Sequence, residues 1–394
     1  MQKQTILDVD IQDKVVLLRV DFNVEMNEGK ISDDSRIKAS IPTISYLKSK
    51  NAKIILCSHF GRPGGEVVED LRMAPISNHL SELLNQDIEC FSETYSEDIK
   101  SKVEALNPGD IIFLENLRFN PGEEKNDPEF SSSIASLADV FVQDGFGVVH
   151  RAHASTEGVT HFLPSVAGLL VKKEIDTLSN LIQLPESPMV LVLGGAKISD
   201  KIGVIQNFMG KVDTMLIGGG MAGTFLKAQG LEIGKSMVED TKLDLASEFI
   251  HKAKQNGINF ILPQDVVIAE SFEPNANKIT VDVDKVPSDW YIMDIGHKTL
   301  DLFKREVAIA KTVLWNGPMG VFEFSAFRRG TIELAATLGS LDGVTTVLGG
   351  GSTAEVVESL HISNKITHVS TGGGATLEFL EGKELPGIAA LMDK

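Results

Sequence analysis

The chain has 394 residues, of which 42% are apolar and 23% are charged, and its formal net charge is −18. A single hydrophobic core is hard to build at this length, so we expect two substantial domains. The acidic balance argues against partners such as nucleic acid or membrane, and no apolar run reaches the roughly 20 residues of a membrane span. The opening MQKQTILDVD lacks the basic and apolar segments of a secretory signal, which predicts a cytoplasmic protein.

Short β-branched runs alternate with helical periodicity through the first half of the chain. KVVLLRVDF precedes a helical pattern from about Asp34 to Lys50, KIILCSHF precedes another near Ile76 to Leu84, and DIIFLENLRF and VFVQDGF follow. Uniformly apolar runs such as KIILC are typical of parallel strands covered on both faces. The first half therefore predicts a doubly wound, mostly parallel α/β sheet. A further helical pattern, from about Val166 to Gln183, ends before Pro185 and Pro188, which indicate a break in the chain.

The second half repeats this alternation with glycine-rich strand ends. The strand-like runs are MVLVLGGAK, VDTMLIGGGMA, INFILPQDVV, KTVLWNGPMG, VTTVLGGGSTA and ITHVSTGGGAT. Three of them end in GGG before a helical pattern, which exposes bare backbone at the sheet edge where open α/β sheets bind ligands. We therefore expect a second Rossmann-like domain that binds a nucleotide. The less regular stretch 278–295 suggests a small antiparallel addition.

One motif favours a different enzyme class. Gly218, Gly220 and Gly223 satisfy G-x-G-x-x-G after DTMLI, and Glu239 and Asp240 follow at the distance seen in NAD-dependent dehydrogenases. That fingerprint belongs to the first strand of its domain, however, whereas here GGG recurs twice more. The dehydrogenase hypothesis is therefore the weaker one.

Polar and basic side chains recur where the predicted strands of the first half end. They are Arg19, Asp21 and Asn23 in RVDFN, His59 and Arg62 in SHFGRP, Arg118 in ENLRF, and His150, Arg151 and His153 in HRAHAS, with Arg36 at the start of a helix. Strand ends converge in a doubly wound sheet, and the arginine fork suits phosphate or carboxylate. The pattern predicts a pocket for a small anion, although any single arginine could equally form a surface ion pair.

Two lysines mark a second candidate site. In GGAKISDK, Lys197 and Lys201 follow a glycine turn and would share one face of a helix. Two ammonium groups beside a glycine turn suit the phosphates of a nucleotide, and the alternative is a solvated lysine face.

Eight motifs together resemble those of phosphoglycerate kinases. They occur in the family's order from about Asp13 to the C-terminus: RVDFNV, SHFGRP, LENLRF, HRAHAST, LGGAKISDKI, IGGGMAGTF, TVLWNGPMGVFE and STGGGATLEFLEG. The resemblance implies a monomeric glycolytic enzyme that transfers a phosphoryl group between ATP and 3-phosphoglycerate, giving ADP and 1,3-bisphosphoglycerate, with Mg²⁺ on the nucleotide. It also implies no nucleic-acid or membrane partner.

The resemblance also assigns residues. The implied acid-substrate pocket comprises Asp21, Phe22, Asn23, Arg36, His59, Phe60, Gly61, Arg62, Arg118 and Arg151. The implied nucleotide site comprises Lys197, Lys201, Gly219, Asn316, Glu323, Gly349, Gly350, Gly351, Ser352 and Thr353, with Glu323 on the ribose. The implied catalytic groups are Arg36, Lys201, Gly372 and Gly373.

The same resemblance implies two lobes joined by a hinge helix that contains Lys172, Lys173 and Glu174. Residues 1–170, with 382–394 returning to them, would bind the acid, and residues 171–381 the nucleotide. Turn 370–374 is a second candidate hinge.

The chain departs from the family pattern at three positions: Glu25 and His297 each replace a proline, and Ser352 replaces an aspartate beside the nucleotide's metal. A serine hydroxyl is a weaker, neutral ligand, so we expect Mg²⁺ to depend more on phosphate and water. The alternative is a non-catalytic relative that keeps both pockets. The pair Arg36 and Lys201 favours the enzyme, because a pure binding protein has no use for both.

Overall fold

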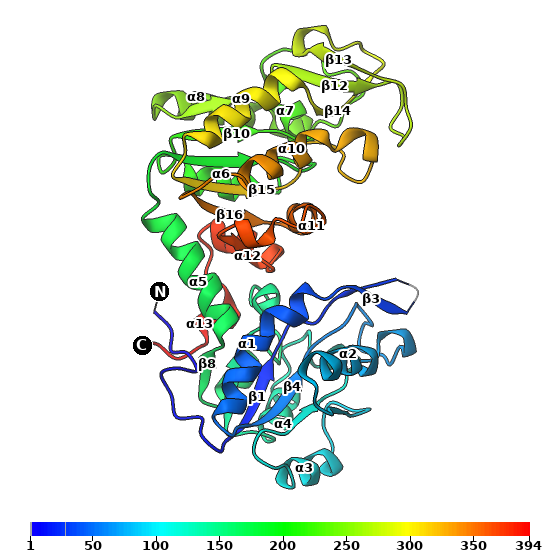
Figure 1. Cartoon of the computed structure of the whole chain (residues 1–394), viewed down its shortest axis with the longest axis vertical. Coiled ribbons are helices and arrows are strands. Elements are labelled where there is room, and N and C mark those ends of the chain that lie inside the picture. The colour runs from blue at the N-terminus through cyan, green and yellow to red at the C-terminus, as the bar shows by residue number, and fades with distance from the viewer. Residues whose placement is uncertain (1, 28) are drawn as a thin grey trace. The chain divides into compact units, whose positions relative to one another are not determined.

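The computed structural model describes residues 2–27 and 29–394, which form two compact units (Figure 1). The first unit runs to Asp176 and takes up the chain again at Glu384–Lys394, and the second is Thr177–Lys383. The division falls inside helix α5 (Leu169–Gln183), so one helix belongs to both units. In the described part of the chain no helix is long and apolar enough to cross a membrane.

The first unit is built on a six-stranded parallel sheet in the order β5-β6-β4-β1-β7-β8. Its strands are β1 (Val15–Arg19), β4 (Lys53–Cys57), β5 (Glu89–Cys90), β6 (Ile111–Phe113), β7 (Val140–Gln143) and β8 (Ser165–Ala167). Its helices are α1 (Ser35–Ser49), α2 (Ala74–Leu84), α3 (Glu97–Glu104), α4 (Pro128–Ala135) and α13 (Pro386–Ala389). A hairpin of β2 (Glu25–Asn27) and β3 (Lys30–Asp33) precedes α1.

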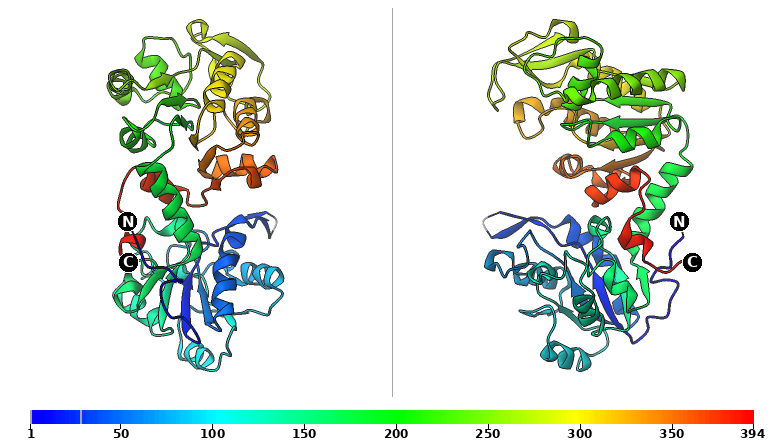
Figure 2. Two further views of the ribbon diagram at one scale, coloured as in Figure 1. Left: turned by 60° about the vertical axis from the view of Figure 1, so that its left-hand side comes forward. Right: turned by 180° about the vertical axis from the view of Figure 1, so that it is seen from behind.

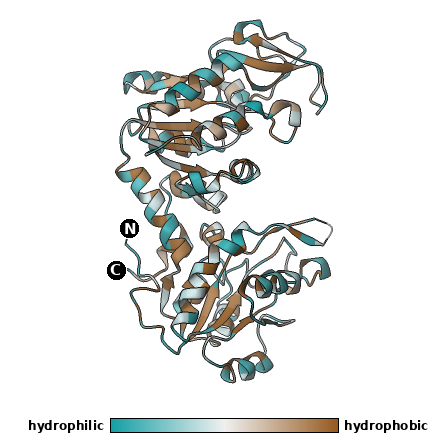
Figure 3. Ribbon diagram, in the orientation of Figure 1, coloured by the Kyte–Doolittle hydropathy of each residue, from teal (hydrophilic) through white to brown (hydrophobic). Residues whose placement is uncertain are grey.

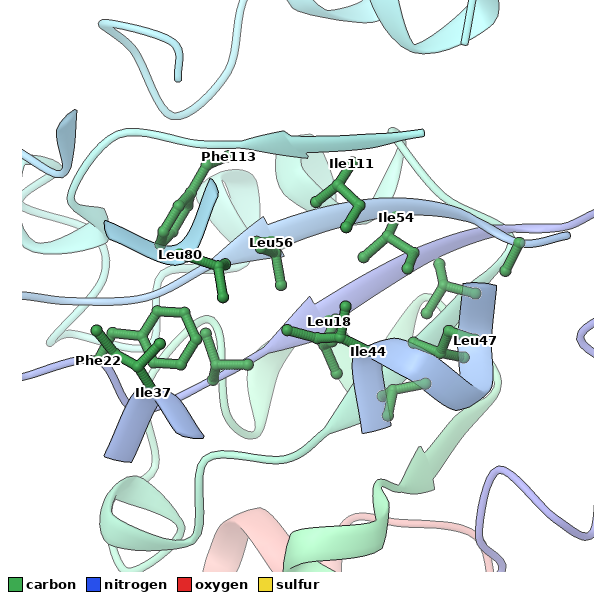
Figure 4. Packing of buried hydrophobic residues seen from close by; sticks show 14 of the residues in the cluster. Leu18, Phe22, Ile37, Ile44, Leu47, Ile54, Leu56, Leu80, Ile111 and Phe113 are labelled. Carbon is green, nitrogen blue, oxygen red and sulfur yellow. The ribbon is translucent and has the colours of Figure 1, made fainter. Parts of the chain in front are cut away.

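The core of this unit lies between the sheet and α1. Leu18, Ile54 and Leu56 project from the strands onto Ile44 and Leu47 of the helix, and all five are fully buried (Figure 4). At the usual 25 cal/mol per Å², side chains of this size each contribute about 1.5–3 kcal/mol through burial. The packing fixes α1 along the sheet, which places the helix's first turn beside the carboxyl end of β1.

The second unit contains another six-stranded parallel sheet, in the order β11-β10-β9-β15-β16-β17. The strands are β9 (Met189–Leu193), β10 (Thr214–Ile217), β11 (Asn259–Ile261), β15 (Thr312–Asn316), β16 (Thr345–Gly349) and β17 (His368–Val369). The helices are α6 (Ile202–Phe208), α7 (Met221–Ala228), α8 (Leu243–Gln255), α9 (His297–Ala308), α10 (Arg329–Leu338), α11 (Gly351–Ser359) and α12 (Gly374–Leu380). The strands of both sheets are predominantly hydrophobic, whereas the helices carry polar outer faces (Figure 3). The predicted doubly wound architecture is confirmed for both sheets.

The strand order locates a ligand site in each sheet. In the second unit the chain moves outward from β9 to β10 and β11 and then resumes on the other side with β15, so the loops after β9 and β15 diverge. In the first unit β1 and β7 are related in the same way. Such switch points open a crevice at the carboxyl ends of the strands, where doubly wound sheets bind ligands.

The predicted antiparallel addition is confirmed and is larger than expected. A three-stranded sheet in the order β13-β12-β14 contains β12 (Asp265–Ala269), β13 (Lys278–Asp282) and β14 (Tyr291–Ile295). Its central strand comes from DVV in INFILPQDVV, which the sequence pattern assigned to the main sheet. The change of direction follows Pro263, which interrupts that apolar run.

Two local predictions were wrong. Val166 and Ala167 lie in strand β8 because they pair with Val142 and Gln143 of β7. The N-terminal segment adds to this pairing, since Ala167 N–H donates to the Gln4 carbonyl and Ile6 N–H donates to the Ala167 carbonyl. Lys197 and Lys201 do not share a helix, because residues 194–201 form turns and α6 begins at Ile202.

The C-terminal segment ends beside the N-terminal one, as the views in Figure 2 show. Lys3 pairs with Asp393, and its ammonium group donates hydrogen bonds of 2.8 Å to the carbonyls of Ala389 and Leu391. Gly387 N–H donates to the Val149 carbonyl, two residues before Arg151. The end of the chain therefore supports the loop that carries a candidate site residue.

Candidate active site

The first unit gathers charged groups at the carboxyl ends of β1 and β4. Asp21 lies just beyond β1 and is nearly buried, and its Oδ2 accepts a 2.6 Å hydrogen bond from Arg36 at the start of α1. Its other oxygen lies 3.9 Å from Nδ1 of His59, which follows β4. The Arg19 guanidinium lies 3.2 Å from the same His59 nitrogen. Four of the predicted residues therefore meet at one end of the sheet.

His59 is neutral in this surrounding. Burial, followed by the positive charges of Arg19, Arg118 and Arg151, holds the pKa of the imidazole well below its ordinary range. Because Nδ1 faces the Arg19 guanidinium, which can only donate, Nδ1 acts as the acceptor and Nε2 carries the proton. His59 is thus a fixed hydrogen-bond donor for an oxygen atom and is not an acid or a base at neutral pH.

A backbone turn after His59 joins two further predicted residues. Gly61 N–H donates to Asn23 Oδ1 at 2.8 Å, and the Gly61 carbonyl accepts from Arg118 at 2.8 Å. Gly61 has a positive φ of 64°, and a Cβ here would lie 2.7 Å from a Leu71 methyl group. Glycine is therefore required for the turn that links Asn23 to Arg118.

Burial lowers the pKa of the Arg118 guanidinium, and the charges of Arg151 and Arg19 lower it further, against the opposing effect of Glu124. The positive charges of Arg118, Arg151 and Arg19 therefore lie close together, and the nearby carboxylates do not fully neutralise them. Such an arrangement attracts an anion, since a bound phosphate or carboxylate would relieve their repulsion.

The remaining predicted residues of this pocket differ in exposure. Arg62 is exposed and makes no hydrogen bond or ion pair within the described ranges, whereas Arg151 is half-buried with Nε 3.2 Å from His150 Nε2. The side chains of Phe22 and Phe60 belong to the hydrophobic core, and the Phe22 ring packs on Phe113 at 5.9 Å. If these two phenylalanines contact a ligand, they do so through their backbone.

A buried carboxylate supports the arginines and was not predicted. Glu123 accepts hydrogen bonds from the Ser155 hydroxyl at 2.6 Å and the Ser155 amide at 3.1 Å, and Ser155 Oγ in turn accepts from Arg19 Nε at 2.9 Å. Burial raises the pKa of Glu123, while the positive charge of Arg19 opposes that rise. Glu123 therefore orients Arg19 through Ser155. The local sequence could not single it out, because the adjacent Glu124 looks identical but is exposed.

The second unit contains a cavity of about 410 Å³ beside the β9/β15 switch point. Gly195, Gly219 and Pro318 are among the residues that line it. Gly219 has a φ of +64°, and a Cβ there would lie 2.6 Å from both the amide nitrogen and the carbonyl oxygen of Gly195. The glycine turns thus pack directly on one another and leave room for a ligand above them.

The cavity's wall is mostly apolar. Leu226, Met237, Phe272, Tyr291 and Phe324 line it, and the Phe272 ring lies 5.3 Å from Phe324 and 6.2 Å from Tyr291. Glu323 is exposed at the same cavity. A mostly apolar cavity with an exposed carboxylate at Glu323 and a buried one at Asp294 suits a nucleobase and its ribose. Sequence analysis missed the aromatic residues, since the small antiparallel sheet that brings Tyr291 here has no local signature of ligand binding.

Lys201 is the buried cation of this unit. Its ammonium group donates to Asn316 Oδ1 at 2.5 Å, and burial lowers its pKa to about 8 despite the nearby charges of Asp200 and Glu381. Lys197, by contrast, is exposed and has no hydrogen-bond partner in the described part of the chain. The two lysines therefore have different surroundings: Lys201 is buried and held by Asn316, whereas Lys197 is exposed to solvent.

The turn after β16 leads into α11. Gly350 has a φ of +98°, and Thr353 Oγ1 in the first turn accepts a 3.1 Å hydrogen bond from Gly317 N–H. Asn316 Nδ2 is buried without a partner and lies 3.0 Å from where a Gly349 Cβ would be. This places Asn316 between Lys201 and the glycine turn. Gly372 and Gly373 precede α12 in a similar turn, where Gly373 has a φ of +52°.

The described residues contain no group of three His, Cys, Asp or Glu side chains that could hold a metal ion. The half-buried Ser352 hydroxyl, in the first turn of α11, is a neutral oxygen. These donors suit Mg²⁺ that arrives with a nucleotide, because this ion readily keeps phosphate and water ligands.

Comparisons with known proteins agree over the whole chain. The model of the phosphoglycerate kinase family matches residues 6–383. A phosphoglycerate kinase of Pelotomaculum thermopropionicum is 52% identical over 394 residues, which is 100% of both chains. The solved structure of phosphoglycerate kinase from Coxiella burnetii has a TM-score of 0.87 at 38% identity, and the enzyme from Pyrococcus horikoshii OT3 has 0.85 at 32%; each alignment covers 98% of both chains.

Proposed function

We propose how this chain, which belongs to the phosphoglycerate kinase family, transfers a phosphoryl group between ATP and 3-phosphoglycerate. The reaction is the glycolytic phosphotransfer of that family, and the chain is a phosphotransferase. The observation that supports the residue assignments below is that each unit contains a different binding site. One unit holds clustered arginines around a neutral histidine, and the other holds a glycine-lined cavity with a buried lysine.

The first unit binds 3-phosphoglycerate. Its phosphate is held by arginines near the strand ends, with Arg62, Arg118 and Arg151 as its partners. Asp21 and Asn23 bind the hydroxyl group, Asp21 also fixes Arg36, and His59 donates Nε2–H to an oxygen of the acid. The support for this assignment is the 2.6 Å bond between Asp21 and Arg36 together with the lowered pKa of Arg118.

The second unit binds the adenine nucleotide. The base occupies the mostly apolar cavity, Glu323 holds the ribose, and the phosphates follow the glycine turns toward Lys197 and the start of α11. Lys201 and Asn316 contact the transferring phosphoryl oxygens, aided by the amides of Gly372 and Gly373. Mg²⁺ arriving with the nucleotide would supply positive charge to the phosphates, and the Ser352 hydroxyl would be at most a weak ligand for it.

The chemistry needs no general base. The nucleophile is the acid's carboxylate, which is already ionised at neutral pH. Catalysis therefore consists of aligning the reactants and neutralising charge on the three equatorial phosphoryl oxygens, with Arg36 from one unit and Lys201 from the other. The neutral state of His59 accords with this view, because no proton has to be accepted at that position.

Transfer requires the two units to bring their substrates into line and to exclude water, because each unit holds only one of them. Helix α5, which continues from one unit into the other, is the proposed hinge, with turn 370–374 as the second. A single chain contains both sites, so a monomer suffices. Small-angle scattering should show a smaller radius of gyration with both substrates than with either one, and an unchanged radius would contradict closure.

The proposed function is tested by following ATP consumption with 3-phosphoglycerate and Mg²⁺ in an assay coupled to NADH oxidation. Each component is omitted in turn as a control. We expect turnover only when all three are present. Binding of both substrates without turnover would favour the non-catalytic relative instead.

A further inference from the structure

The carboxyl group of Asp144 has no part in the proposed transfer, although it lies at the switch point of the first sheet. It follows β7 directly and is fully buried. Its Oδ1 accepts a 2.9 Å hydrogen bond from the amide of Leu170 and lies 3.5 Å from the amide of Val171. Both amides belong to the first turn of α5. The contact is so close that a Cβ on Gly168 would lie 2.1 Å from the same oxygen, so glycine is needed there.

Helix α1 contacts the same turn of α5. The amide of Leu169 donates a 3.0 Å hydrogen bond to the hydroxyl of Thr43, a fully buried residue of α1. A helix begins with four amides that lack a partner inside the helix. In α5 the amides of Leu169, Leu170 and Val171 are therefore taken by a neighbouring helix and by the strand end.

These contacts connect α5 to the substrate pocket through one rigid element. Thr43 lies two turns after Arg36 on α1, and residues at this spacing share a helix face. Arg36 is bound to Asp21 at the start of the pocket, and the same helix is held along the sheet by Ile44 and Leu47. Helix α1 therefore carries both Arg36, which faces the pocket, and Thr43, which accepts from the first amide of α5.

The charge of Asp144 depends on pH near neutrality. Burial raises its pKa to about 7, against the opposing contacts from the Thr43 hydroxyl and the amides of Leu170 and Val171. None of these contacts carries a charge. The charged residues of the elements packed around Asp144 do not contribute to the shift of its pKa. These residues are Arg19 on β1, Arg36, Lys38 and Lys48 on α1, and Lys172, Lys173, Glu174 and Asp176 on α5. The ionised form is the stronger cap, because the positive end of a helix attracts an anion.

We propose that Thr43 and Asp144 are positioning residues that couple occupancy of the Arg36 pocket to helix α5, and through α5 to the second unit. The inference rests on the proposed function, since only a reaction that needs both units responds to the helix they share. Neither residue touches substrate. Both act by holding the first turn of α5 in register with α1 and β7.

A matched pair of variants tests the coupling. Thr43→Val keeps the shape of the side chain and removes the hydroxyl acceptor, whereas Thr43→Ser keeps the hydroxyl. We expect Thr43→Val to lower kcat by at least about tenfold, since small misplacement of reacting groups is costly. Its KM for ATP should stay within about twofold of wild type, because the nucleotide cavity lies wholly in the second unit. Thr43→Ser should retain most of the turnover, and equal kcat values for the two variants would overturn the proposal.

Asp144→Asn supplies an independent readout, which also serves if Thr43→Val does not fold. In the wild type, kcat should rise as pH increases through about 7, because the carboxylate ionises and strengthens the cap. The Asn variant should lose that rise and keep a low kcat across the range. A variant with the wild-type pH profile would contradict the proposal.

Hydrogen exchange separates this inference from the proposed function. Adding 3-phosphoglycerate should slow amide exchange in the peptide spanning 169–171 of the wild type, and not in Thr43→Val. That result needs no turnover, so it stands even if the assay with ATP fails. Protection that increases equally in both proteins would refute the coupling, whereas failure of the wild-type assay alone would refute the proposed function.

Discussion

Replacing Lys201 with methionine should separate catalysis from stability. Lys201 is 7% exposed and bonded to Asn316, and its pKa falls from the ordinary 10.5 to about 8. At 1.36 kcal/mol per pKa unit, holding the charged form costs about 3 kcal/mol. At pH 7 the ammonium is protonated in the folded and unfolded chain alike, so this cost lowers stability there. Methionine removes it and leaves Asn316 Oδ1 unpaired, a loss of about 1–3 kcal/mol.

The two effects on stability nearly cancel, so the free energy of unfolding should stay within about 2 kcal/mol of wild type. The catalytic activity of Lys201→Met, by contrast, should fall. Removing one charged donor from the transferring phosphoryl group costs about 2.7–4 kcal/mol, a fall of about 10²–10³ in kcat. The assay is coupled ATP consumption beside urea unfolding, with Lys211→Met as a control, because Lys211 is an exposed lysine bonded to Asn207.

The pH profile checks the same assignment. For the free enzyme, kcat/KM for ATP should fall as pH rises through about 8, because the folded-state pKa is where the ammonium group loses its charge. Stability should change in the opposite direction and rise between about pH 8 and 10.5, since the folded chain then holds fewer protons than the unfolded one. A Lys201→Met protein with nearly full turnover, or a wild type without the alkaline fall, would refute the role of Lys201.

Three further substitutions test other parts of the account. Arg36→Ala should lower kcat by about 10²–10³, whereas the control Lys38→Ala on the same helix should leave kcat unchanged. Near-wild-type turnover of Arg36→Ala would contradict the catalytic role of Arg36. Ser352→Asp should tighten the apparent Mg²⁺ affinity seen in a metal titration of the rate, and an unchanged affinity would show that position 352 does not face the metal. Gly219→Ala places a Cβ 2.6 Å from Gly195, so KM for ATP should rise at least about tenfold with KM for 3-phosphoglycerate unchanged. If both constants stayed at wild-type values, the cavity would not be the nucleotide site.

The sequence pattern predicted the parts of this molecule that depend on local chemistry. Apolar runs such as KIILC indicated buried parallel strands, and glycine clusters indicated turns that expose backbone to a ligand. Asp21, His59 and Arg36 were expected together because strand ends converge at one edge, and the 2.6 Å bond from Arg36 to Asp21 agrees.

The features that the pattern missed depend on contacts between distant segments. Val166 is helical by periodicity, yet it lies in strand β8, which pairs with β7 on one side and with the N-terminal segment on the other. Glu123 resembles the exposed Glu124 beside it, and only the approach of Ser155 and Arg19 distinguishes them. Tyr291 lines the cavity because β14 of the small antiparallel sheet packs against helix α10, a contact that no local periodicity records. Burial and partner identity are properties of the assembled fold, so they appear only in the structure.

Trapping the product tests most directly that the acid's carboxylate receives the phosphoryl group. The purified chain is incubated with ATP, Mg²⁺, 3-phosphoglycerate and hydroxylamine, which converts an acyl phosphate into a hydroxamate, and the acid is analysed by mass spectrometry. The account predicts a hydroxamate at the carboxyl carbon, formed in step with ADP and only when ATP, Mg²⁺ and the acid are all present. ADP and inorganic phosphate with unmodified acid would contradict it.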